Sequence, residues 1–190
     1  MNGTITSRQF YIKSRTEARE YCDGQGGFYK RPVFFCQAWE NGELFKEWTN
    51  GKITQRYQAN IYAIMKVVIE LVNENYKGEI IAYIPDKLIV DEANHDEHYP
   101  FKNGSIEELT DLINYCWKAK PYRLTRWIYL GEAFKRAKLN GIDLNIKLLD
   151  KNDIEIINSV MSQLLGKGKE KTDQPKKIRL YTQPRTRTKN

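Results

Sequence analysis

Residues 33–86 constrain the fold of this chain more than any other stretch, because their patterns of polar and apolar residues follow one another in a defined order. Two segments, 33–39 and 43–48, are rich in aromatic and other apolar residues and are typical of β-strands. They are joined through Asn41 and Gly42, and an Asn-Gly pair between two such segments is the strongest short signal for a β-hairpin. This part of the chain therefore predicts two antiparallel strands.

A long amphipathic helix is expected directly after the hairpin, over about residues 54–75. Apolar residues recur there at helical spacing, and Thr54 is the expected N-terminal cap. The apolar segment 79–84 is typical of a central strand, and Pro85 ends it because proline cannot donate to the ladder. Asp86 then lies at the carboxyl end of that strand. A hairpin that leads through a helix into a buried strand indicates a mixed α/β fold.

The N-terminal part of the chain allows two interpretations. In the first, residues 8–13 form a short strand, and Ser14 and Glu17 form a capping box that opens a short helix over 17–22. In the second, Glu20–Cys22 is the end of the first strand, and the glycine-rich segment 23–27 is the loop that follows it.

The remaining elements are expected to be mostly helical, and the chain contains no internal repeat. They are a polar loop over 91–104, a helix that Ser105 and Glu108 cap and that includes 106–117, a helix over 124–140 that ends at Asn140-Gly141, a strand over 144–149 and a helix over 153–165.

The net charge of +7 is concentrated at the C-terminal end of the chain. Residues 167–190 contain nine Lys and Arg and two Asp and Glu, whereas residues 1–166 contain 22 of each sign. We therefore expect one globular domain over 1–166 and a basic tail over 167–190. Basic tails neutralise phosphates without reading sequence, so this one indicates a nucleic-acid partner. The alternative is a solubilising end that binds nothing.

Several classes of protein are not expected. The chain has no run of about 18 apolar residues that could span a membrane, and its first residues lack the pattern of a signal peptide. Its three cysteines are widely spaced and include no Cys-x-x-Cys pair, which argues against a disulfide framework and a zinc ribbon. This usage fits a reducing compartment, and we expect a cytoplasmic protein.

The order of strands and helices resembles that of the ribonuclease H-like superfamily, over about residues 8–165. Three segments carry the resemblance. Residues 54–63 look like the start of the family's first long helix, 80–90 look like its fourth strand with an aspartate before a short helix, and 127–159 look like its last helices and fifth strand. The resemblance implies an α/β fold with a mixed five-stranded sheet flanked by helices.

The same resemblance implies a site in which four carboxylates hold two magnesium ions, since Mg²⁺ prefers hard oxygen ligands. The strand-four aspartate falls on Asp86. The strand-one aspartate falls on Asp23 in the second N-terminal interpretation, and on Lys13 or Ser14 in the first. The two remaining acidic positions fall on amides, Asn60 and Asn158. Asp23 and Asp86 are thus the candidate metal ligands, and the two amides remove two negative charges from the expected site.

Nucleic-acid contacts are expected from basic residues in two places. One is a cluster before the helix over 124–140, and the other is the tail; the candidates are Lys118, Lys120, Arg123, Arg126, Lys176, Lys177, Arg179, Arg185 and Arg187. Tyr57, Tyr122 and Trp127 lie near basic residues and are weaker candidates for stacking on bases. His95 and His98 lack further ligands and a helical frame, so a solvated loop is the expectation there.

Three functions remain open. The first is a ribonuclease H-like protein that has lost part of its metal site and binds RNA, DNA or RNA/DNA hybrid, within a larger nucleoprotein complex. The second is an active or engineered-inactive Mg²⁺-dependent ribonuclease H that cuts the RNA strand of a hybrid, with Asp153 or Glu155 supplying a further acid. The third is a structural adaptor whose tail contacts RNA or a partner.

Overall fold

The computed structural model describes residues 7–22, 25, 27–51, 53–94, 100–119 and 121–150, and for residues 121–125 it describes the backbone alone. The predicted helix over 153–165 and the tail lie outside these residues. The described elements are β1 (Ser7–Cys22), β2 (Phe28–Glu40), β3 (Glu43–Thr49), α1 (Arg56–Asn73), β4 (Gly78–Ile84), α2 (Lys87–Asn94), α3 (Ile106–Lys118), α4 (Pro121–Leu139) and β5 (Ile142–Leu148).

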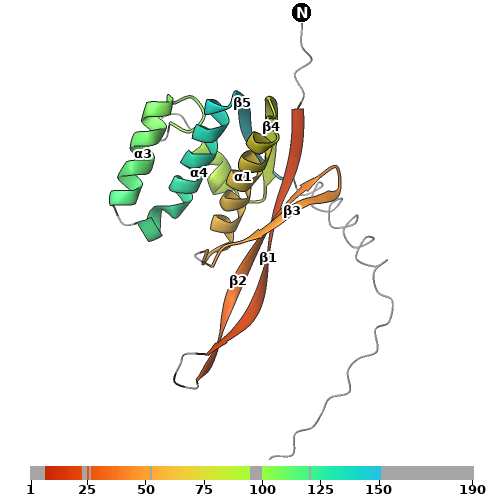
Figure 1. Ribbon diagram of the computed structural model, residues 1–190, viewed down its shortest axis with the longest axis vertical. Helices are drawn as coiled ribbons and strands as arrows, with labels where there is room; N and C mark the ends of the chain where they lie inside the picture. The colour runs from red at the N-terminus through yellow and green to blue at the C-terminus, as the bar shows by residue number, and fades with distance from the viewer. Residues whose placement is uncertain are drawn as a thin grey trace, which may run out of the picture.

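The five strands form one mixed sheet in the order β3-β2-β1-β4-β5 (Figure 1). β1, β2 and β3 are antiparallel neighbours, whereas β4 pairs with β1 and β5 pairs with β4 in parallel. The predicted fold class is confirmed, because a mixed five-stranded sheet flanked by helices is the architecture that the resemblance to ribonuclease H implies.

The β2–β3 hairpin forms as its turn residues predict. Asn41 and Gly42 have φ values of 52° and 83°, in the left-handed region that a tight hairpin turn requires. Glu40 pairs with Glu43 beside the turn, and the register shifts between Ala38 and Trp39. A bulge of this kind increases the local twist of the strand pair.

The N-terminal strand ends where the second interpretation of the sequence places its end. β1 runs without interruption to Cys22, so the helix over 17–22 is wrong, and Glu20–Cys22 as the end of the first strand is confirmed. The backbone is extended there because β2 pairs with it from Tyr11 to Cys22. The carboxylate of Glu17 contacts the guanidinium groups of Arg15 and Arg19 rather than capping a helix.

Helix α1 packs its apolar face against β1 and β2, as the helical spacing predicts. It begins at Arg56 with Gln55 as N-cap, so Thr54 is not the cap. The backbone N–H and the hydroxyl of Thr54 instead lie within hydrogen-bond distance of Gln58 Oε1, at 3.0 and 3.3 Å. The buried face is wider than the predicted stripe, because Ala59, Asn60, Ala63 and Val67 are buried as well.

The predicted loop over 91–104 is wrong at its start, because α2 continues to Asn94. Ile89 and Ala93, one helical turn apart, are buried and hold α2 against the body of the protein. The capping box of α3 is confirmed: Glu108 N donates to Ser105 Oγ at 3.1 Å, and Ser105 N donates to Glu108 Oε2 at 2.7 Å.

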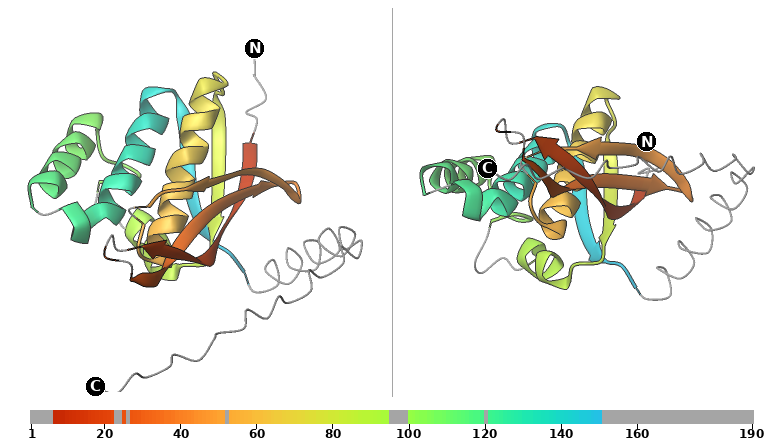
Figure 2. Two further views of the ribbon diagram at one scale, coloured as in Figure 1. Left: turned by 60° about the horizontal axis from the view of Figure 1, so that its bottom comes forward. Right: turned by 90° about the horizontal axis from the view of Figure 1, so that it is seen from below.

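Helices α1 and α4 cover one face of the sheet side by side, and α3 packs on the outer side of α4 (Figure 2). Helix α4 ends at Gly141, whose φ of +67° suits a helix C-terminus, and leads into β5. Because β5 runs parallel to β4, the N-terminus of α4 lies at the carboxyl ends of these strands. Among the described residues, no helix is both long and apolar enough to cross a lipid bilayer.

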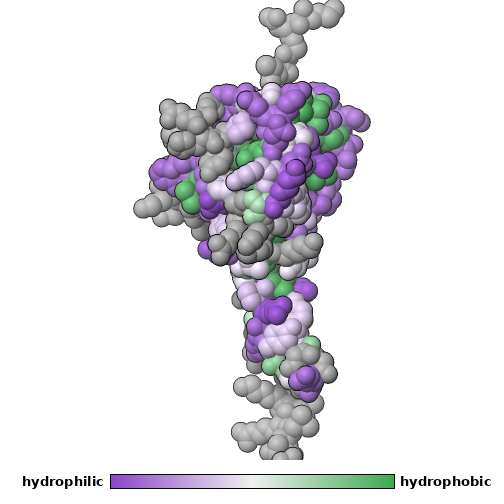
Figure 3. All heavy atoms as spheres, turned by 90° about the vertical axis from the view of Figure 1, so that its left-hand side faces the viewer, coloured by the Kyte–Doolittle hydropathy of each residue, from purple (hydrophilic) through white to green (hydrophobic). Residues whose placement is uncertain are grey.

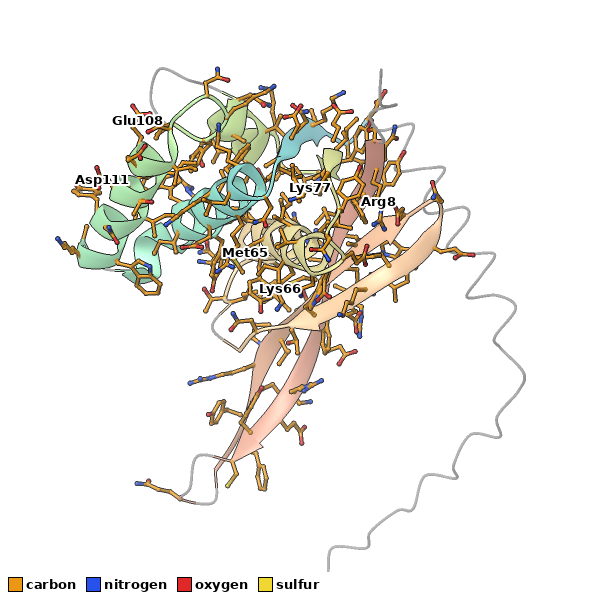
Figure 4. The ribbon with its side chains drawn as sticks, turned by 45° about the horizontal axis from the view of Figure 1, so that its top comes forward. Arg8, Met65, Lys66, Lys77, Glu108 and Asp111 are labelled. Carbon is orange, nitrogen blue, oxygen red and sulfur yellow. The ribbon has the colours of Figure 1, made fainter. Side chains whose placement is uncertain are left out.

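The opposite end of the sheet is held by Arg8, labelled in Figure 4. Its guanidinium donates to both carboxylate oxygens of Glu40 at 2.7 Å and to Glu74 at 2.9 Å. These ion pairs join β1, β2 and the C-terminal end of α1.

Gly131 lets α3 and α4 pack closely. A Cβ at this position would lie 2.9 Å from Ile113 Cγ1. We expect Gly131→Ala to lower the free energy of unfolding by about 1–3 kcal/mol through overpacking. The matched control is Gly51→Ala, where a Cβ has no neighbour within 4 Å and the change is expected to stay within about 0.5 kcal/mol. Urea unfolding followed by circular dichroism measures both, and equal stability of the two variants would contradict the packing described here.

Candidate functional site

A cleft of about 490 Å³ lies where the N-terminal turn of α1 meets the carboxyl end of β4. The residues that line it come from α1, from the β4–α2 connection and from the first turn of α2; they are Arg56, Tyr57, Asn60, Pro85, Asp86, Lys87 and Leu88. Pro85 ends β4, so the chain turns there and presents Asp86 at the edge of the sheet. Asn60 lies on the second turn of α1.

Among the described residues that line this cleft, Asn60 is the most deeply buried polar one. It is 1% exposed, and its Oδ1 has no hydrogen-bond partner among the described residues. A buried acceptor without a partner costs about 1–3 kcal/mol. The amide oxygen is therefore positioned to accept from a ligand donor or to contact a cation.

The structure brings together two of the four site residues expected from the sequence. Asp86 and Asn60 line the same cleft, one from the strand end and one from the helix. Asp23 and Asn158 lie outside the described residues, as do Asp153, Glu155, His95 and His98.

The strand-one position beside Asp86 can be found from the register. Tyr11 pairs with Tyr83, and continuing three residues along both chains places Ser14 level with Asp86. Ser14 is 6% exposed and alternates with Phe10 and Ile12, which are also buried. The first strand therefore carries a hydroxyl at this level.

Glu92 is a residue near the site that the sequence analysis did not single out. Its carboxylate accepts from Arg126 Nη2 at 2.8 Å and from Trp127 Nε1 at 3.3 Å. Burial raises the pKa of Glu92, the cation of Arg126 and the bond from Trp127 lower it, and the charge of Asp86 raises it further. The sequence does contain a signal for the helix that carries Glu92. Ile89 and Ala93 lie at helical spacing, which predicts that a helix continues into the start of the segment 91–104 that was expected to be a loop.

The described residues do not by themselves fit a two-magnesium centre. Two cations need several carboxylate ligands, and no group of three or more His, Cys, Asp or Glu residues that could hold a metal occurs among the described residues. Asp86 supplies one carboxylate and Asn60 one neutral oxygen, while the carboxylate of Glu92 is engaged by Arg126 and Trp127. The described lining of the cleft therefore contains one carboxylate and one neutral amide.

The basic candidates of the globular part lie around the α3–α4 connection. Lys118 is exposed at the end of α3, and Arg126 lies 5.9 Å from the ring of Tyr57 and 4.9 Å from that of Trp127. The side chain of Arg126 is thus held between the cleft and Glu92. Arg123 lies on α4, where only its backbone is described. Lys120, Lys176, Lys177, Arg179, Arg185 and Arg187 lie outside the described residues.

Arg126→Met is expected to lower the free energy of unfolding at neutral pH by about 2 kcal/mol. This is less than the roughly 3–5 kcal/mol of a fully buried pair, because the Arg126 side chain is 25% exposed. The loss should shrink as the pH falls toward the ordinary glutamate pKa of 4.5. A carboxyl whose pKa is higher in the folded than in the unfolded state makes the protein less stable as the pH rises. Removing Arg126 raises the pKa of Glu92 further, so this effect becomes larger in the variant.

Urea unfolding across this pH range measures the effect. The double variant Arg126→Met/Glu92→Gln is the control, because it removes the buried charge together with its partner. A loss that is the same at every pH, or equal in the double variant, would contradict this account of the pair.

Comparison with known proteins finds solved structures of similar fold but no relative by sequence. No family model matches the chain. No curated protein matches it either. Among solved structures it is similar to RNase H1 from the halophilic archaeon Halobacterium salinarum NRC-1, with 12% identity over 85% of this chain and 99% of that chain and a TM-score of 0.42. The N-terminal RNase H domain of a Mycobacterium tuberculosis protein gives 10% identity, 83% and 99% coverage and a TM-score of 0.39.

A foamy viral protease-reverse transcriptase, solved in complex with an RNA/DNA hybrid, gives 13% identity, 80% and 19% coverage and a TM-score of 0.44. These identities do not carry residue roles to this chain. The strand order, the parallel β1–β4–β5 half of the sheet and the helices that cover it are its own features, and they assign the chain a ribonuclease H-like fold.

Proposed function

We propose that this chain is a nucleic-acid-binding protein of ribonuclease H-like fold in which part of the metal site has been replaced by neutral residues, and that it acts within a nucleoprotein assembly. One observation carries the proposal. The cleft at the end of β4 joins Asp86 to Asn60, an amide with a buried and unpartnered oxygen, where the resemblance asks for an acid.

The charges around the cleft support binding rather than hydrolysis. Arg56 and Lys87 line it beside Asp86, and a guanidinium and an ammonium are suitable partners for phosphates. Lys87 also donates to Asp91 at 2.6 Å, an exposed pair that a phosphate would compete with. Asn60 Oδ1 can accept from a sugar hydroxyl or a base amino group. Asn60 and Ser14 are neutral, and the nearby carboxylate of Glu92 is engaged by Arg126 and Trp127, which lowers the affinity for a pair of divalent cations.

The basic tail supports the same partner. It carries the entire net charge of the chain, and Lys and Arg in such a segment neutralise phosphates of RNA, DNA or a hybrid alike. We propose that the domain over 1–166 and the tail over 167–190 bind one nucleic acid together.

Fluorescence anisotropy of labelled RNA, DNA and hybrid in the presence of EDTA tests the proposal. We expect binding at low salt that EDTA does not weaken and that Asp86→Asn leaves intact or strengthens. Absence of binding to all three nucleic acids at low salt would refute it.

An active ribonuclease H is the second candidate, and the position of Asp86 in the cleft favours it. Its further acid would come from Asp153 or Glu155 and the ion would be Mg²⁺; β1 carries Cys22, the neighbour of Asp23, eight residues beyond Ser14 and so away from Asp86. A labelled hybrid that is cut in Mg²⁺ or Mn²⁺ and left whole by the Asp86→Asn variant would establish this function instead.

A further inference from the structure

The first two strands extend beyond the sheet as an arm. Phe35 and Thr49 form the last pair of β2 with β3, and Tyr11 and Tyr83 the last pair of β1 with β4. Seven β1–β2 pairs continue past that point, from Thr16–Phe34 to Cys22–Phe28, over about 20 Å. Figures 1 and 3 show this arm as a narrow projection from the body of the molecule. We call residues 16–22 and 28–34 the arm.

The two faces of the arm carry different chemistry. Paired residues of antiparallel strands share a face, so Tyr21–Tyr29, Arg19–Arg31 and Glu17–Val33 lie on one face, continued at its root by Arg15–Phe35. The other face carries Cys22–Phe28, Glu20–Lys30, Ala18–Pro32 and Thr16–Phe34. We call the first the Tyr–Arg face. It has three arginines and one glutamate, and Arg15 at its root also donates to Glu47 of β3 at 2.9 and 3.0 Å. On the second face Glu20 and Lys30 form an ion pair of 3.3 Å.

The Tyr–Arg face contains two like charges opposite each other. Arg19 and Arg31 are directly paired, which is unfavourable in an isolated sheet. Arg19 lies 3.9 Å from Glu17, whereas the only described contact of Arg31 is with the ring of Tyr29, 4.9 Å away. An anion that binds across the pair would relieve this repulsion.

Aromatic rings extend the same face toward the far end of the arm. The rings of Tyr21 and Tyr29 are stacked with centroids 5.8 Å apart, and both residues are exposed, at 39% and 38%. At the root, the guanidinium groups of Arg15 and Arg19 lie 4.0 and 5.2 Å from the ring of Phe35. Along the face, the tyrosine pair is thus followed by the arginine pair, and after Glu17–Val33 by Arg15 and the ring of Phe35.

We propose that the Tyr–Arg face of the arm is a binding surface for single-stranded nucleic acid, with bases stacked on Tyr21 and Tyr29 and phosphates held by Arg19 and Arg31. Aromatic platforms with adjacent cations are what single-stranded RNA and DNA require. This inference rests on the nucleic-acid binding proposed above and adds a second, separate contact surface to it.

The position of the arm fits this partner. β1 runs parallel to β4, so the arm continues from the same end of the sheet at which Asp86 and the cleft lie. The Tyr–Arg face itself lies on the side of the sheet that α1 does not cover, because Phe10, Ile12 and Ser14, which alternate with its residues along β1, are buried. It is therefore a contact surface separate from the cleft. The edges of the arm carry charged residues and Pro32, which disfavour pairing with a strand of another protein.

Anisotropy measurements with the full chain and short labelled single strands of RNA and of DNA test the proposal. We expect Tyr21→Ser/Tyr29→Ser to weaken single-strand binding by about tenfold or more. Arg19→Gln/Arg31→Gln should reduce the slope of log affinity against log salt by about 1.4, which is about 0.7 for each phosphate contact. Comparison of the RNA and DNA strands shows which of the two the arm prefers.

The opposite face provides matched controls. Phe28 is the most exposed aromatic residue of the arm, at 77%, and Phe28→Ser and Glu20→Gln/Lys30→Gln are expected to leave single-strand affinity unchanged. Thermal unfolding by circular dichroism should be the same for all these variants and the wild type, because the substituted residues are exposed.

Each other outcome is decisive. Wild-type affinity of both Tyr–Arg variants, or an equal loss in the controls, overturns the arm proposal and leaves the proposed function standing. A loss restricted to duplex or hybrid overturns the choice of single strands. A change in self-association by sedimentation with no change in affinity assigns the arm to a protein contact. A wild-type chain that binds no nucleic acid refutes the proposed function itself.

Discussion

Asn60→Asp is expected to lower the free energy of unfolding by about 3 kcal/mol in EDTA at neutral pH, and millimolar Mn²⁺ or Mg²⁺ is expected to restore much of the loss. Residue 60 is 1% exposed and shares its cleft with Asp86, so a carboxylate there is both desolvated and repelled. A divalent cation between the two carboxylates offsets both costs. The wild-type protein, with a neutral amide, should unfold at the same temperature with and without metal.

The pH dependence of this variant has a defined sign. Burial and the charge of Asp86 disfavour the ionised form, so the pKa of the introduced carboxyl is expected to be raised. A carboxyl with a raised pKa makes the folded protein less stable as the pH rises. The loss of unfolding free energy of Asn60→Asp in EDTA should therefore disappear on acidification. Gln58→Glu is the matched control, because Gln58 is 6% exposed on the same helix but does not line the cleft. Metal that rescued Gln58→Glu equally, or stabilised the wild type as much, would contradict the assignment of the cleft.

Deletion of residues 167–190 is expected to have the largest effect on binding, a loss of about 10³-fold in affinity for duplex or hybrid at low salt. The tail supplies nine basic residues and all of the net charge, and each phosphate contact contributes about 0.9 to the salt slope on a duplex. Anisotropy over a range of salt concentrations gives both the affinity and the slope.

A variant with the nine tail Lys and Arg residues changed to Gln separates charge from chain length and should behave like the deletion. We expect both proteins to unfold at the wild-type temperature, because the domain over 1–166 contains the hydrophobic core. An unchanged salt slope after deletion would show that the tail does not contact phosphates. A lost fold would show that the boundary at 166 is wrong. Loss of assembly with retained nucleic-acid affinity would favour the adaptor function.

Local signals made most of the fold predictable. Asn41-Gly42 set the hairpin turn, the apolar spacing set α1, Pro85 ended β4, and Ser105 with Glu108 capped α3. In each case one residue type has a strong conformational preference that acts over a few positions. The expectation that Asp86 and Asn60 belong to one site came from the resemblance to ribonuclease H, and both residues line the cleft.

The arm could not be predicted in the same way. Residues 14–22 contain Arg, Glu and Ala, which favour helices, and a capping-box pattern at Ser14 and Glu17. Their extended backbone comes from twelve pairs with β2, beginning at Tyr11, and pairing between distant strands leaves little trace in either strand alone. Glu92 was missed for a related reason, since α2 is only eight residues long and its buried face consists of Ile89 and Ala93.

The central claim is that the cleft binds nucleic acid without the metal centre of a nuclease. A time course with an end-labelled RNA/DNA hybrid, in EDTA and then in Mg²⁺ or Mn²⁺, tests it most directly, with binding followed in the same samples and Asp86→Asn run in parallel. We predict that wild type and variant both hold the hybrid in EDTA and that neither cuts it after metal is added. Cleavage by the wild type that Asp86→Asn abolishes would contradict the account.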